Sequence, residues 1–410
     1  MSLKNKKYFK KDFWAPPLNF ANDLRKKFNL QKNIYVHDVT LRDGEQTPGV
    51  AFSTDEKVLV AHELDKLGVN SIELGLPVIP KDFKAMEILA REKSIKAKLT
   101  CLVRARKDDI DAAVKSGIRA VILEHTVNTV ACDIAYGMTE KDLIKKNIEM
   151  IKYAKERGLW VNWMGWDAFR SEPAQIERIF KAVVYGADPE AVTIADTFGM
   201  LHPVATFDFF KNMRKWFPEK LLDLHAHNDM GMATANAICA LTAGANGVHT
   251  AVNGLGERAG NISLEEVAAT MDGCFNIPVV GDISRLARVS KLLVQLSKIQ
   301  VASNKPVVGD GLFLVESGLI MHIFLKAEQK KFPLTIMQPF LPSKVGQNDI
   351  KYVVGKGAGK ATVEHFTKKY GIKLTDEKIF KLIELIKDEA TLRKSYLSVD
   401  EFLEIVKKIR

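Results

Sequence analysis

The chain reads Leu221-Leu222-Asp223-Leu224-His225-Ala226-His227-Asn228-Asp229-Met230-Gly231 at the point that decides its fold. The short apolar run at the start of this segment is typical of a buried strand. Successive side chains of a strand point to opposite faces, so His225 and His227 share a face and can present two imidazoles to one metal ion. Two histidines at a polar strand end also serve in ordinary hydrogen bonding, and this motif alone does not decide between the two interpretations.

Short runs of the same kind recur along the chain and alternate with stretches of helical spacing, several of which end in a glycine. The runs are Ile34–Thr40, Ser71–Gly75, Lys98–Val103, Ala120–Glu124, Leu159–Met164, Ala191–Ala195, Leu221–His227 and Gly247–Val252. This alternation predicts an α/β fold, a (β/α)8 TIM barrel. A doubly wound open sheet is the alternative.

Polar side chains follow every one of these runs, and this favours the barrel. They are Arg42, Asp43 and Glu45; Glu73; Arg104; Glu124 and His125; Asp167 and Arg170; Asp196 and Thr197; His225, His227 and Asp229; and Asn253, Glu257, Arg258 and Asn261. The loops after all eight strands of a barrel surround one opening, whereas most strand ends of an open sheet lie outside its crevice. Each residue taken alone could be a helix cap or part of a loop ion pair, but together they indicate one site.

Composition narrows the choice of partners. The net charge of +10 is spread over lysines that alternate with glutamates, which is not typical of a nucleic-acid interface. Four separated cysteines indicate free thiols in a reducing compartment. The lysine-rich start, residues 1–11, has no apolar segment after it. We therefore expect a cytoplasmic protein with neither a nucleic-acid nor a membrane partner.

Several motifs resemble those of the DRE-TIM metallolyase superfamily, most closely its 2-isopropylmalate, homocitrate and citramalate synthase branch. They are Asp38-Val39-Thr40-Leu41-Arg42-Asp43-Gly44-Glu45-Gln46, Glu73-Leu74-Gly75-Leu76-Pro77, Asp196-Thr197-Phe198-Gly199, His225 to Gly231, and Asn253-Gly254-Leu255-Gly256-Glu257-Arg258-Ala259-Gly260-Asn261. We expect a leader at 1–33, the barrel catalytic domain at 34–285 and small, mostly helical C-terminal subdomains at 286–410. The leucine-binding regulatory domain of many such synthases is expected to be absent.

The resemblance implies a metal-dependent condensation of acetyl-CoA with an α-keto acid. Asp43, His225, His227 and Asn261 would bind a divalent metal such as Mg²⁺, Mn²⁺ or Zn²⁺. Four residues would bind the keto acid: Arg42, which would also stabilise the alkoxide, together with Glu73, Arg104 and Thr197. The family also implies an intertwined homodimer and a role in the biosynthesis of amino acids and other carboxylic acids.

The chain departs from the family at acid–base positions. Trp166 stands where the synthases usually have a glutamate, and Ile320 stands where they have a histidine. Glu316, His125 or Glu124 could act as the catalytic base instead. Trp163 and Trp166 either reshape the keto-acid pocket or pack in the barrel wall.

Three hypotheses about function follow. The first is an acyltransferase of the synthase type. The second is a metal-dependent carbon–carbon lyase or aldolase of the same superfamily, similar to HMG-CoA lyase. The third is a metal-binding member that has lost catalysis.

Overall fold

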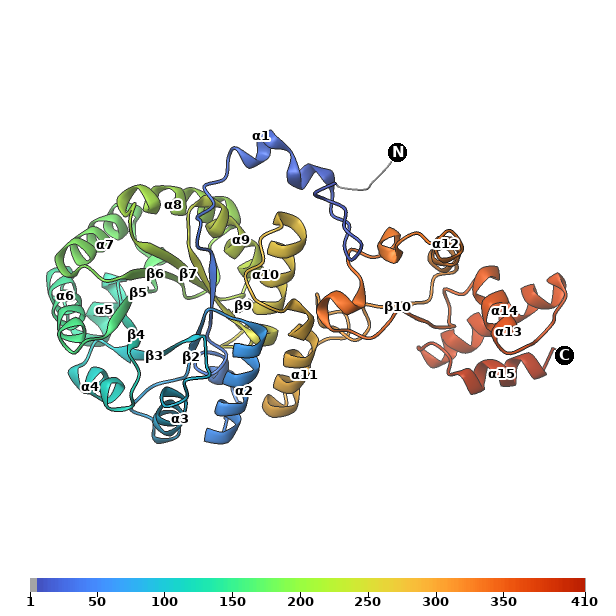
Figure 1. Ribbon diagram of the computed structural model, residues 1–410, viewed down its shortest axis with the longest axis horizontal. Coiled ribbons are helices and arrows are strands. Elements are labelled where there is room, and N and C mark those ends of the chain that lie inside the picture. The colour runs from blue at the N-terminus through green and yellow to red at the C-terminus, as the bar shows by residue number, and fades with distance from the viewer. Residues whose placement is uncertain (1–5, 410) are drawn as a thin grey trace. The chain divides into compact units, whose positions relative to one another are not determined.

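The computed structural model describes residues 6–409, and its larger unit is a closed parallel barrel (Figure 1). The barrel strands are β1 (Tyr35–Asp38), β2 (Ser71–Glu73), β3 (Lys98–Arg104), β4 (Ala120–Thr126), β5 (Trp160–Trp166), β6 (Ala191–Asp196), β7 (Leu221–Ala226) and β8 (Gly247–Ala251). Each strand pairs with the next, and β1 also pairs with β8, placing His37 opposite His249. This closure confirms the predicted barrel and excludes the open sheet.

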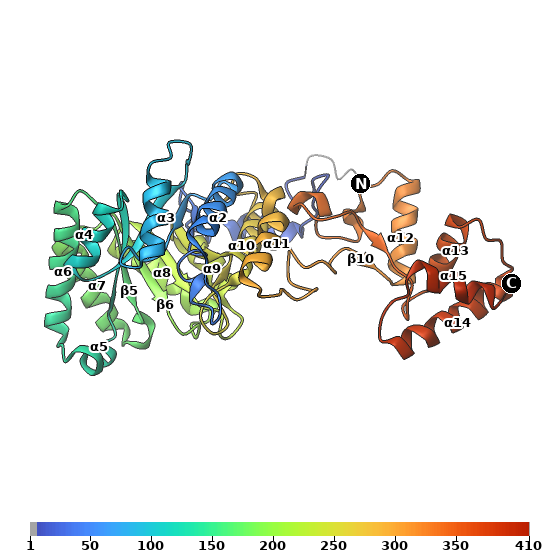
Figure 2. The same ribbon diagram turned by 90° about the horizontal axis from the view of Figure 1, so that it is seen from below.

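Helices follow the strands and surround the barrel, as Figures 1 and 2 show. They are α2 (Thr54–Leu67), α3 (Pro80–Ala90), α4 (Lys107–Lys115), α5 (Thr129–Tyr136), α6 (Glu140–Glu156), α7 (Pro173–Ala187), α8 (Pro203–Trp216), α9 (Ala233–Ala243), α10 (Leu264–Thr270) and α11 (Leu286–Ser297). A short helix, α1 (Asn22–Arg25), precedes β1, and β9 (Ile262–Ser263) extends the sheet beside β8. The carboxyl-terminal ends of the strands form what we call the mouth of the barrel.

The inside of the barrel combines polar and apolar side chains. A small apolar cluster contains Leu102, Ile122, Met164 and Ala195. Buried polar side chains occupy many of the other strand positions, and they include His37, Ser71, Glu73, Thr100, Asn162, Thr193, Asp223 and His249. Buried polar groups are costly unless they are paired, so these positions call for a functional or structural explanation.

A second compact unit contains the N-terminal residues up to Leu18 together with Ala302–Arg410, of which the structure describes 6–18 and 302–409. Its elements are β10 (Leu314–Val315), β11 (Lys351–Tyr352), α12 (Gly318–Gln329), α13 (Lys360–Lys369), α14 (Asp376–Arg393) and α15 (Val399–Lys407). Backbone hydrogen bonds attach the N-terminal segment to the residues around Phe340. The C-terminal portion is thus mostly helical, as predicted.

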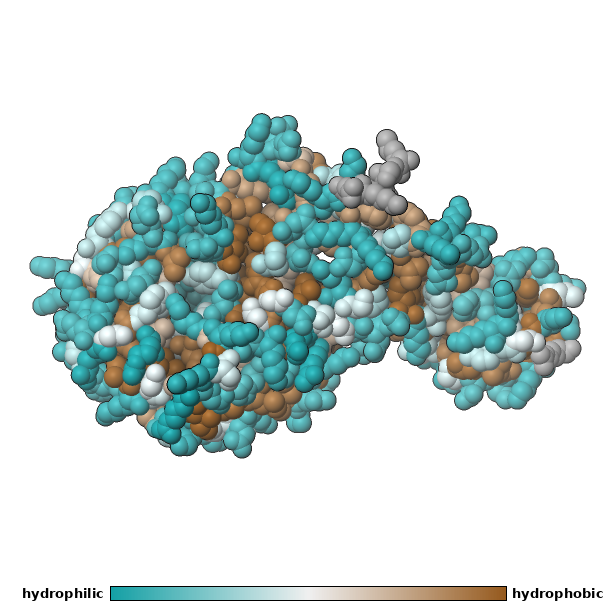
Figure 3. Space-filling model, in the orientation of Figure 1, coloured by the Kyte–Doolittle hydropathy of each residue, from teal (hydrophilic) through white to brown (hydrophobic). Residues whose placement is uncertain are grey.

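The barrel unit runs from Asn19 to Val301 and includes α11, which hydrogen-bonds to the loop after β8 through Ser290 and Asn253. The sequence-based limits of 1–33, 34–285 and 286–410 stay predictions. Hydrophilic side chains cover most of the face of each unit shown in Figure 3. Within residues 6–409, no helix has both the length and the apolar character needed to cross a membrane.

Candidate active site

The loop after β1 carries Arg42 and Asp43, and a buried lysine holds this loop in place. Lys57 of α2 has no exposed side-chain surface, and its Nζ donates to the backbone oxygens of Leu41, at 2.9 Å, and Leu74, at 3.2 Å. Nζ also lies 2.6 Å from a carboxylate oxygen of Glu45 and 2.6 Å from one of Asp82. An ammonium group tolerates complete burial when oxygens surround it in this way. The packing of α2 therefore fixes the position of the loop that carries Arg42 and Asp43.

Asp43, His225 and His227 form a compact group at the mouth, which we call the mouth triad. The Nε2 atoms of the two histidines are 3.4 Å apart, and they lie 3.2 Å and 3.8 Å from Asp43 Oδ2. Ligands of a tetrahedral Zn²⁺ ion at ordinary bond lengths are separated by about 3.4 Å. Three donor atoms thus already have the mutual spacing that one divalent ion requires.

The charge state of the mouth triad suits a metal ion. Burial alone would raise the pKa of Asp43, but the charge of Arg42 and the hydrogen bond with His225 outweigh it, so the pKa lies below its usual range. Burial and the neighbouring His225 lower the pKa of His227 to about 4. Near neutral pH the triad therefore offers a carboxylate and a neutral imidazole of His227, which are the forms that bind metals.

Asn261, in the loop after β8, lies beside the mouth triad as a fourth candidate ligand. Its backbone forms a bridge with that of His227. Its Oδ1 and Asp43 Oδ1 are buried without hydrogen-bond partners. Gly256 permits this approach, because a Cβ there would lie 2.1 Å from Asn261 Nδ2 and 3.3 Å from Asp43 Oδ1. Two buried oxygens without partners beside two imidazoles fit a divalent metal.

Arg42 links the mouth triad to Glu73, the last residue of β2. Its Nη1 donates to Asp43 Oδ2 at 3.0 Å, and its Nε donates to Glu73 Oε1. Burial would raise the pKa of Glu73, but the charge of Arg42 and the hydrogen bond from His37 lower it to about 2. Arg42 Nη2 is buried and has no partner among residues 6–409, so its two N–H groups stay available as donors.

A cavity of about 630 Å³, which we call the strand-end cavity, opens over the ends of β3, β4 and β5. Arg104, Glu124, His125, Tyr136 and Trp166 are among its lining residues. Burial raises the pKa of Glu124, against the opposing charges of Arg42 and His225, and burial lowers the pKa of His125. The cavity therefore holds two groups with perturbed proton affinity, one of which senses the charges of the mouth residues.

The two tryptophans of β5 have different environments. Trp163 is fully buried, donates from Nε1 to Asn147 of α6 at 2.8 Å and packs on Phe180 of α7. It therefore belongs to the packing between strands and helices. Trp166, three residues on, lines the strand-end cavity.

Thr197 and Arg104, two predicted substrate-binding residues, are each held by a neighbour. The Thr197 hydroxyl oxygen accepts from the backbone N–H of Asp167 at 2.9 Å, which leaves its own proton free to be donated. Arg104 makes two hydrogen bonds to Asp109 from its Nε and Nη2 and stays half-exposed. Thr197 follows β6, as the sequence predicted, whereas Arg104 is the last residue of β3.

Glu316 belongs to the other unit, so its predicted role stays a prediction. Its carboxylate accepts from the backbone N–H of Gly357 at 2.8 Å. On α12, Ile320 packs against the apolar core of this unit, whereas His322 is exposed. His322 therefore does not occupy the surroundings of Ile320.

Sequence reasoning overlooked His37 and His249, which lie inside the barrel near Glu73. Each stands in the middle of a short strand next to apolar residues that face outward. The alternation of strand side chains was the available signal, because it places both rings on the inner face.

A closed parallel barrel with histidine and carboxylate donors grouped at the carboxyl-terminal mouth has the architecture of a metal-dependent (β/α)8 enzyme. The chain belongs to the HMGL-like family, whose model matches residues 33–293. This result confirms the resemblance to the DRE-TIM superfamily and identifies the chain as an enzyme of that superfamily.

Relatives that match over most of this chain carry synthase names. Homocitrate synthase AksA of Methanothermobacter thermautotrophicus is 35% identical over 399 residues, which are 97% of this chain and 98% of that protein. A probable 2-isopropylmalate synthase of Ignicoccus hospitalis is 33% identical over 382 residues, covering 93% of each. A putative (R)-citramalate synthase, CimA, of Archaeoglobus fulgidus is 36% identical over 358 residues, covering 87% of this chain and 71% of that one.

Solved structures confirm the barrel fold. Hydroxymethylglutaryl-CoA lyase from Pseudomonas aeruginosa matches with a TM-score of 0.59 and 20% identity, over 66% of this chain and 95% of the lyase. At this identity the likeness extends to the fold alone.

Proposed function

We propose that this chain condenses acetyl-CoA with an α-keto acid in a divalent-metal-dependent, Claisen-type reaction. The observation that carries the proposal is the mouth triad, whose three donor atoms lie 3.2–3.8 Å apart beside Arg42. Relatives named as homocitrate, isopropylmalate and citramalate synthases over most of the chain support the same chemistry.

Arg42 is suited to stabilise negative charge on the keto oxygen. A divalent ion held by Asp43, His225, His227 and Asn261 would supply Lewis-acid polarisation of the carbonyl. Glu73 and Asp43 fix the guanidinium, and an N–H of Nη2 has no partner in the described part of the chain. This N–H would meet the keto oxygen as it becomes an alkoxide, without any rearrangement of the side chain.

Carbon–carbon bond formation needs a base for the methyl group of acetyl-CoA. We propose Glu124 as this base, because its raised pKa and its place between the strand-end cavity and Arg42 suit proton abstraction near neutral pH. His125 and Glu316 remain the other proposed bases. The carbanion attacks the keto carbon, the resulting alkoxide takes up a proton, and water then cleaves the thioester to release CoA.

Thr197 and Arg104 are proposed to bind the keto acid together with Arg42 and Glu73. The free hydroxyl proton of Thr197 can be donated to the substrate carboxylate. Arg104 brings positive charge to the strand-end cavity, which also contains Arg106 and Lys146. Trp166 shapes the same cavity, so its ring would limit the side chain of the keto acid.

The test is release of free thiol from acetyl-CoA with Mg²⁺ or Mn²⁺ and a panel of pyruvate, 2-oxoisovalerate, oxaloacetate, 2-oxoglutarate and glyoxylate. We expect release with one of these acids, and loss of release in Asp43→Ala. Asp388→Ala, which removes an exposed carboxylate of α14, is the matched control and should behave as the wild type. Absence of release across the panel, from folded and metal-loaded protein, would contradict the proposal.

A carbon–carbon lyase is the second candidate, and one observation favours it. Trp166 lines the cavity where the synthases usually have a glutamate, so the usual set of acid–base groups is incomplete. Release of pyruvate or acetoacetate from a 3-hydroxy acid or its CoA ester, without any condensation, would identify a lyase. Silence in both assays with stoichiometric metal would identify a member that has lost catalysis.

We also propose a cytoplasmic homodimer that acts in amino-acid biosynthesis on small molecules, without nucleic-acid or membrane partners. Sedimentation at several protein concentrations tests the oligomeric state, since a mass that stays at one chain would contradict the dimer.

A further inference from the structure

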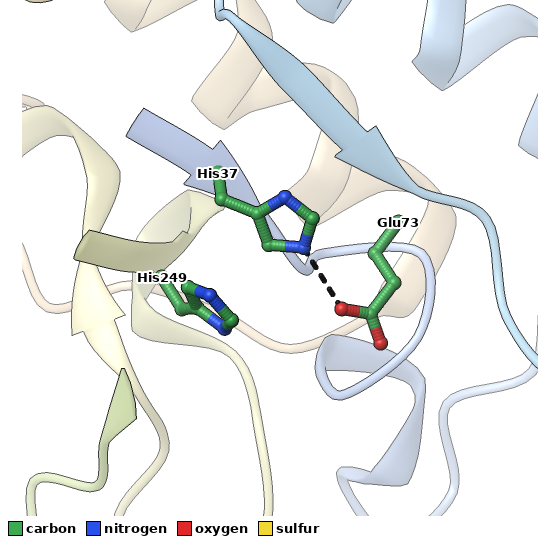
Figure 4. A group of neighbouring side chains, drawn as sticks. All are labelled: His37, Glu73 and His249. Atoms are coloured by element: carbon green, nitrogen blue, oxygen red, sulfur yellow. Dashed lines mark hydrogen bonds and ion pairs between the residues drawn. The ribbon is translucent and has the colours of Figure 1, made fainter. Parts of the chain in front are cut away.

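A second group of metal-binding side chains lies inside the barrel, on three different strands. It consists of His37 of β1, Glu73 of β2 and His249 of β8, which we call the inner triad (Figure 4). One ligand atom from each residue lies within 4.8 Å of the other two, and all three side chains are buried. We propose that the inner triad binds a transition-metal ion of the zinc class, in addition to the ion at the mouth.

The existing contacts of His37 and Glu73 already orient these two side chains toward a common point. His37 Nδ1 lies 2.7 Å from Ser71 Oγ, and its Nε2 lies 2.9 Å from Glu73 Oε2. With an ion bound, a proton on Nδ1 would be donated to Ser71, and Nε2 would present its lone pair to the ion. An ion between Nε2 and Oε2 would satisfy both atoms, in place of the single proton that they otherwise share.

His249 supplies the strongest sign of a ligand, because one of its ring nitrogens has no partner among residues 6–409. Nδ1 is buried without a hydrogen bond. Nε2 lies 3.4 Å from Thr193 Oγ1 and 3.8 Å from Asp223 Oδ2. A proton on Nε2 would point to these oxygens, which leaves the lone pair of Nδ1 unused in the interior of the protein.

The surrounding groups resemble the outer shell of a metal site. Metal-binding histidines commonly donate their second N–H to a hydroxyl, carbonyl or carboxylate, and metal-binding carboxylates are themselves hydrogen-bonded. Here Ser71 is the partner of His37, Thr193 is the partner of His249 with Asp223 close by, and Arg42 donates to the other oxygen of Glu73. A purely structural network would not need to leave His249 Nδ1 without a partner.

The donor set selects the class of ion. Two imidazoles and one carboxylate in a dry interior suit Zn²⁺, Co²⁺ or Ni²⁺, whereas Mg²⁺ prefers oxygen ligands and retains water. Because β1 pairs with β8 and with β2, the ion would tie together the strands that close the barrel. The proposal does not depend on the reaction at the mouth.

The test measures zinc bound per chain, by elemental mass spectrometry after equilibration with Zn²⁺ alone and removal of free metal. We expect two ions in the wild type, one in His249→Gln and one in Asp43→Ala. His322→Gln, which removes an exposed histidine of α12, is the matched control and should retain two. A second readout is the rise in unfolding temperature of Asp43→Ala on addition of zinc, which His249→Gln/Asp43→Ala should lose.

An equal zinc content in folded wild type and His249→Gln would overturn the proposal. If His249→Gln does not fold, anomalous scattering at the zinc edge from crystals of the zinc-loaded wild type decides the question. A peak among His37, Glu73 and His249 supports the inner ion, and a peak confined to the mouth triad overturns it.

Discussion

The mouth triad and the inner triad contain the same donor types, two histidines and one carboxylate, yet they lie in different surroundings. The mouth triad contains Asp43 of the loop after β1, and its donor atoms are 3.2–3.8 Å apart. The inner triad lies on strands, its ligand atoms lie within 4.8 Å of one another, and His37 Nε2 is 2.9 Å from Glu73 Oε2. Arg42 contacts the mouth triad, and the strand-end cavity opens over the ends of β3, β4 and β5 at the same mouth. Donor type therefore defines which ion can bind, whereas access and neighbouring charge define whether a reaction can follow.

Replacing one histidine in each triad separates metal binding that supports the reaction from metal binding inside the barrel. The replacement in the mouth triad should have the largest effect on CoA release. His227→Gln should lower CoA release by roughly 1,000-fold, since a Lewis acid contributes several kcal/mol to the transition state. His249→Gln should lower it by less than about 10-fold, because it acts only through neighbouring groups. Steady-state kinetics on both variants checks this. Equal losses of CoA release in the two variants would show that the two triads do not differ in their roles.

The pH dependence of stability probes the polar interior beneath the inner triad. Burial raises the pKa of Asp223 to about 6, in spite of hydrogen bonds from Tyr35 and Asn162. The native state therefore holds this proton more tightly than the unfolded state does. The resulting stabilisation is fully present below the ordinary pKa of aspartate and is lost as the pH rises through about 6, which amounts to about 3 kcal/mol.

Asp223→Asn should abolish this part of the pH dependence. Urea unfolding of metal-free protein, at pH values between the ordinary aspartate pKa and neutrality, measures the effect as the difference in slope between wild type and variant. Equal slopes of unfolding free energy against pH in wild type and variant would show that Asp223 does not cause this pH dependence. Glu190→Gln, at a partly buried carboxylate just before β6, is a suitable control.

Replacing Glu124 tests whether this residue is the base for the reaction at the mouth. Glu124→Gln should lower kcat by about 100-fold with little change in metal content, as expected for loss of a general base. Because burial raises the pKa of Glu124, wild-type activity should fall with decreasing pH at a higher pH than an ordinary glutamate would cause. An unchanged pH profile in Glu124→Gln would assign the base to another residue, such as His125 or Glu316.

Glu73 belongs to the inner triad and is also hydrogen-bonded to Arg42 beside the mouth triad, so its replacement should have a small and mixed effect. Glu73→Gln keeps a hydrogen-bonding side chain but removes the charge that faces Arg42 and His37. We expect about a 10-fold fall in kcat and loss of the inner ion, with the mouth ion retained. Zinc content and kcat measured on the same preparation check this. Retention of both ions would show that the carboxylate charge is not needed inside the barrel.

Sequence alone predicted the barrel because each strand is a local apolar run, and its observed limits differ little from the predicted ones. The predicted strand Ile34–Thr40 is observed as Tyr35–Asp38, and Leu221–His227 as Leu221–Ala226. The mouth triad was predictable because His225 and His227 lie two residues apart at the end of β7 and Arg42 and Asp43 share one motif. Local patterns suffice where the residues of a site are neighbours in the sequence.

The inner triad escaped prediction because its members come together only when the barrel closes. His37 and His249 lie at opposite ends of the barrel sequence and meet through the pairing of β1 with β8. The environments of Trp163 and Trp166 likewise depend on the face that each presents, because a separation of three residues places them on opposite sides of a strand.

Chemical labelling of Lys57 can follow the opening of the barrel over time. Its amine is buried and engaged with four oxygens, so reagents that acylate surface lysines within minutes cannot reach it in the folded protein. Acylation of Lys57 requires α2 to detach from the loop that carries Arg42 and Asp43. The rate at which this one lysine becomes labelled would therefore record how often the barrel opens at its catalytic end.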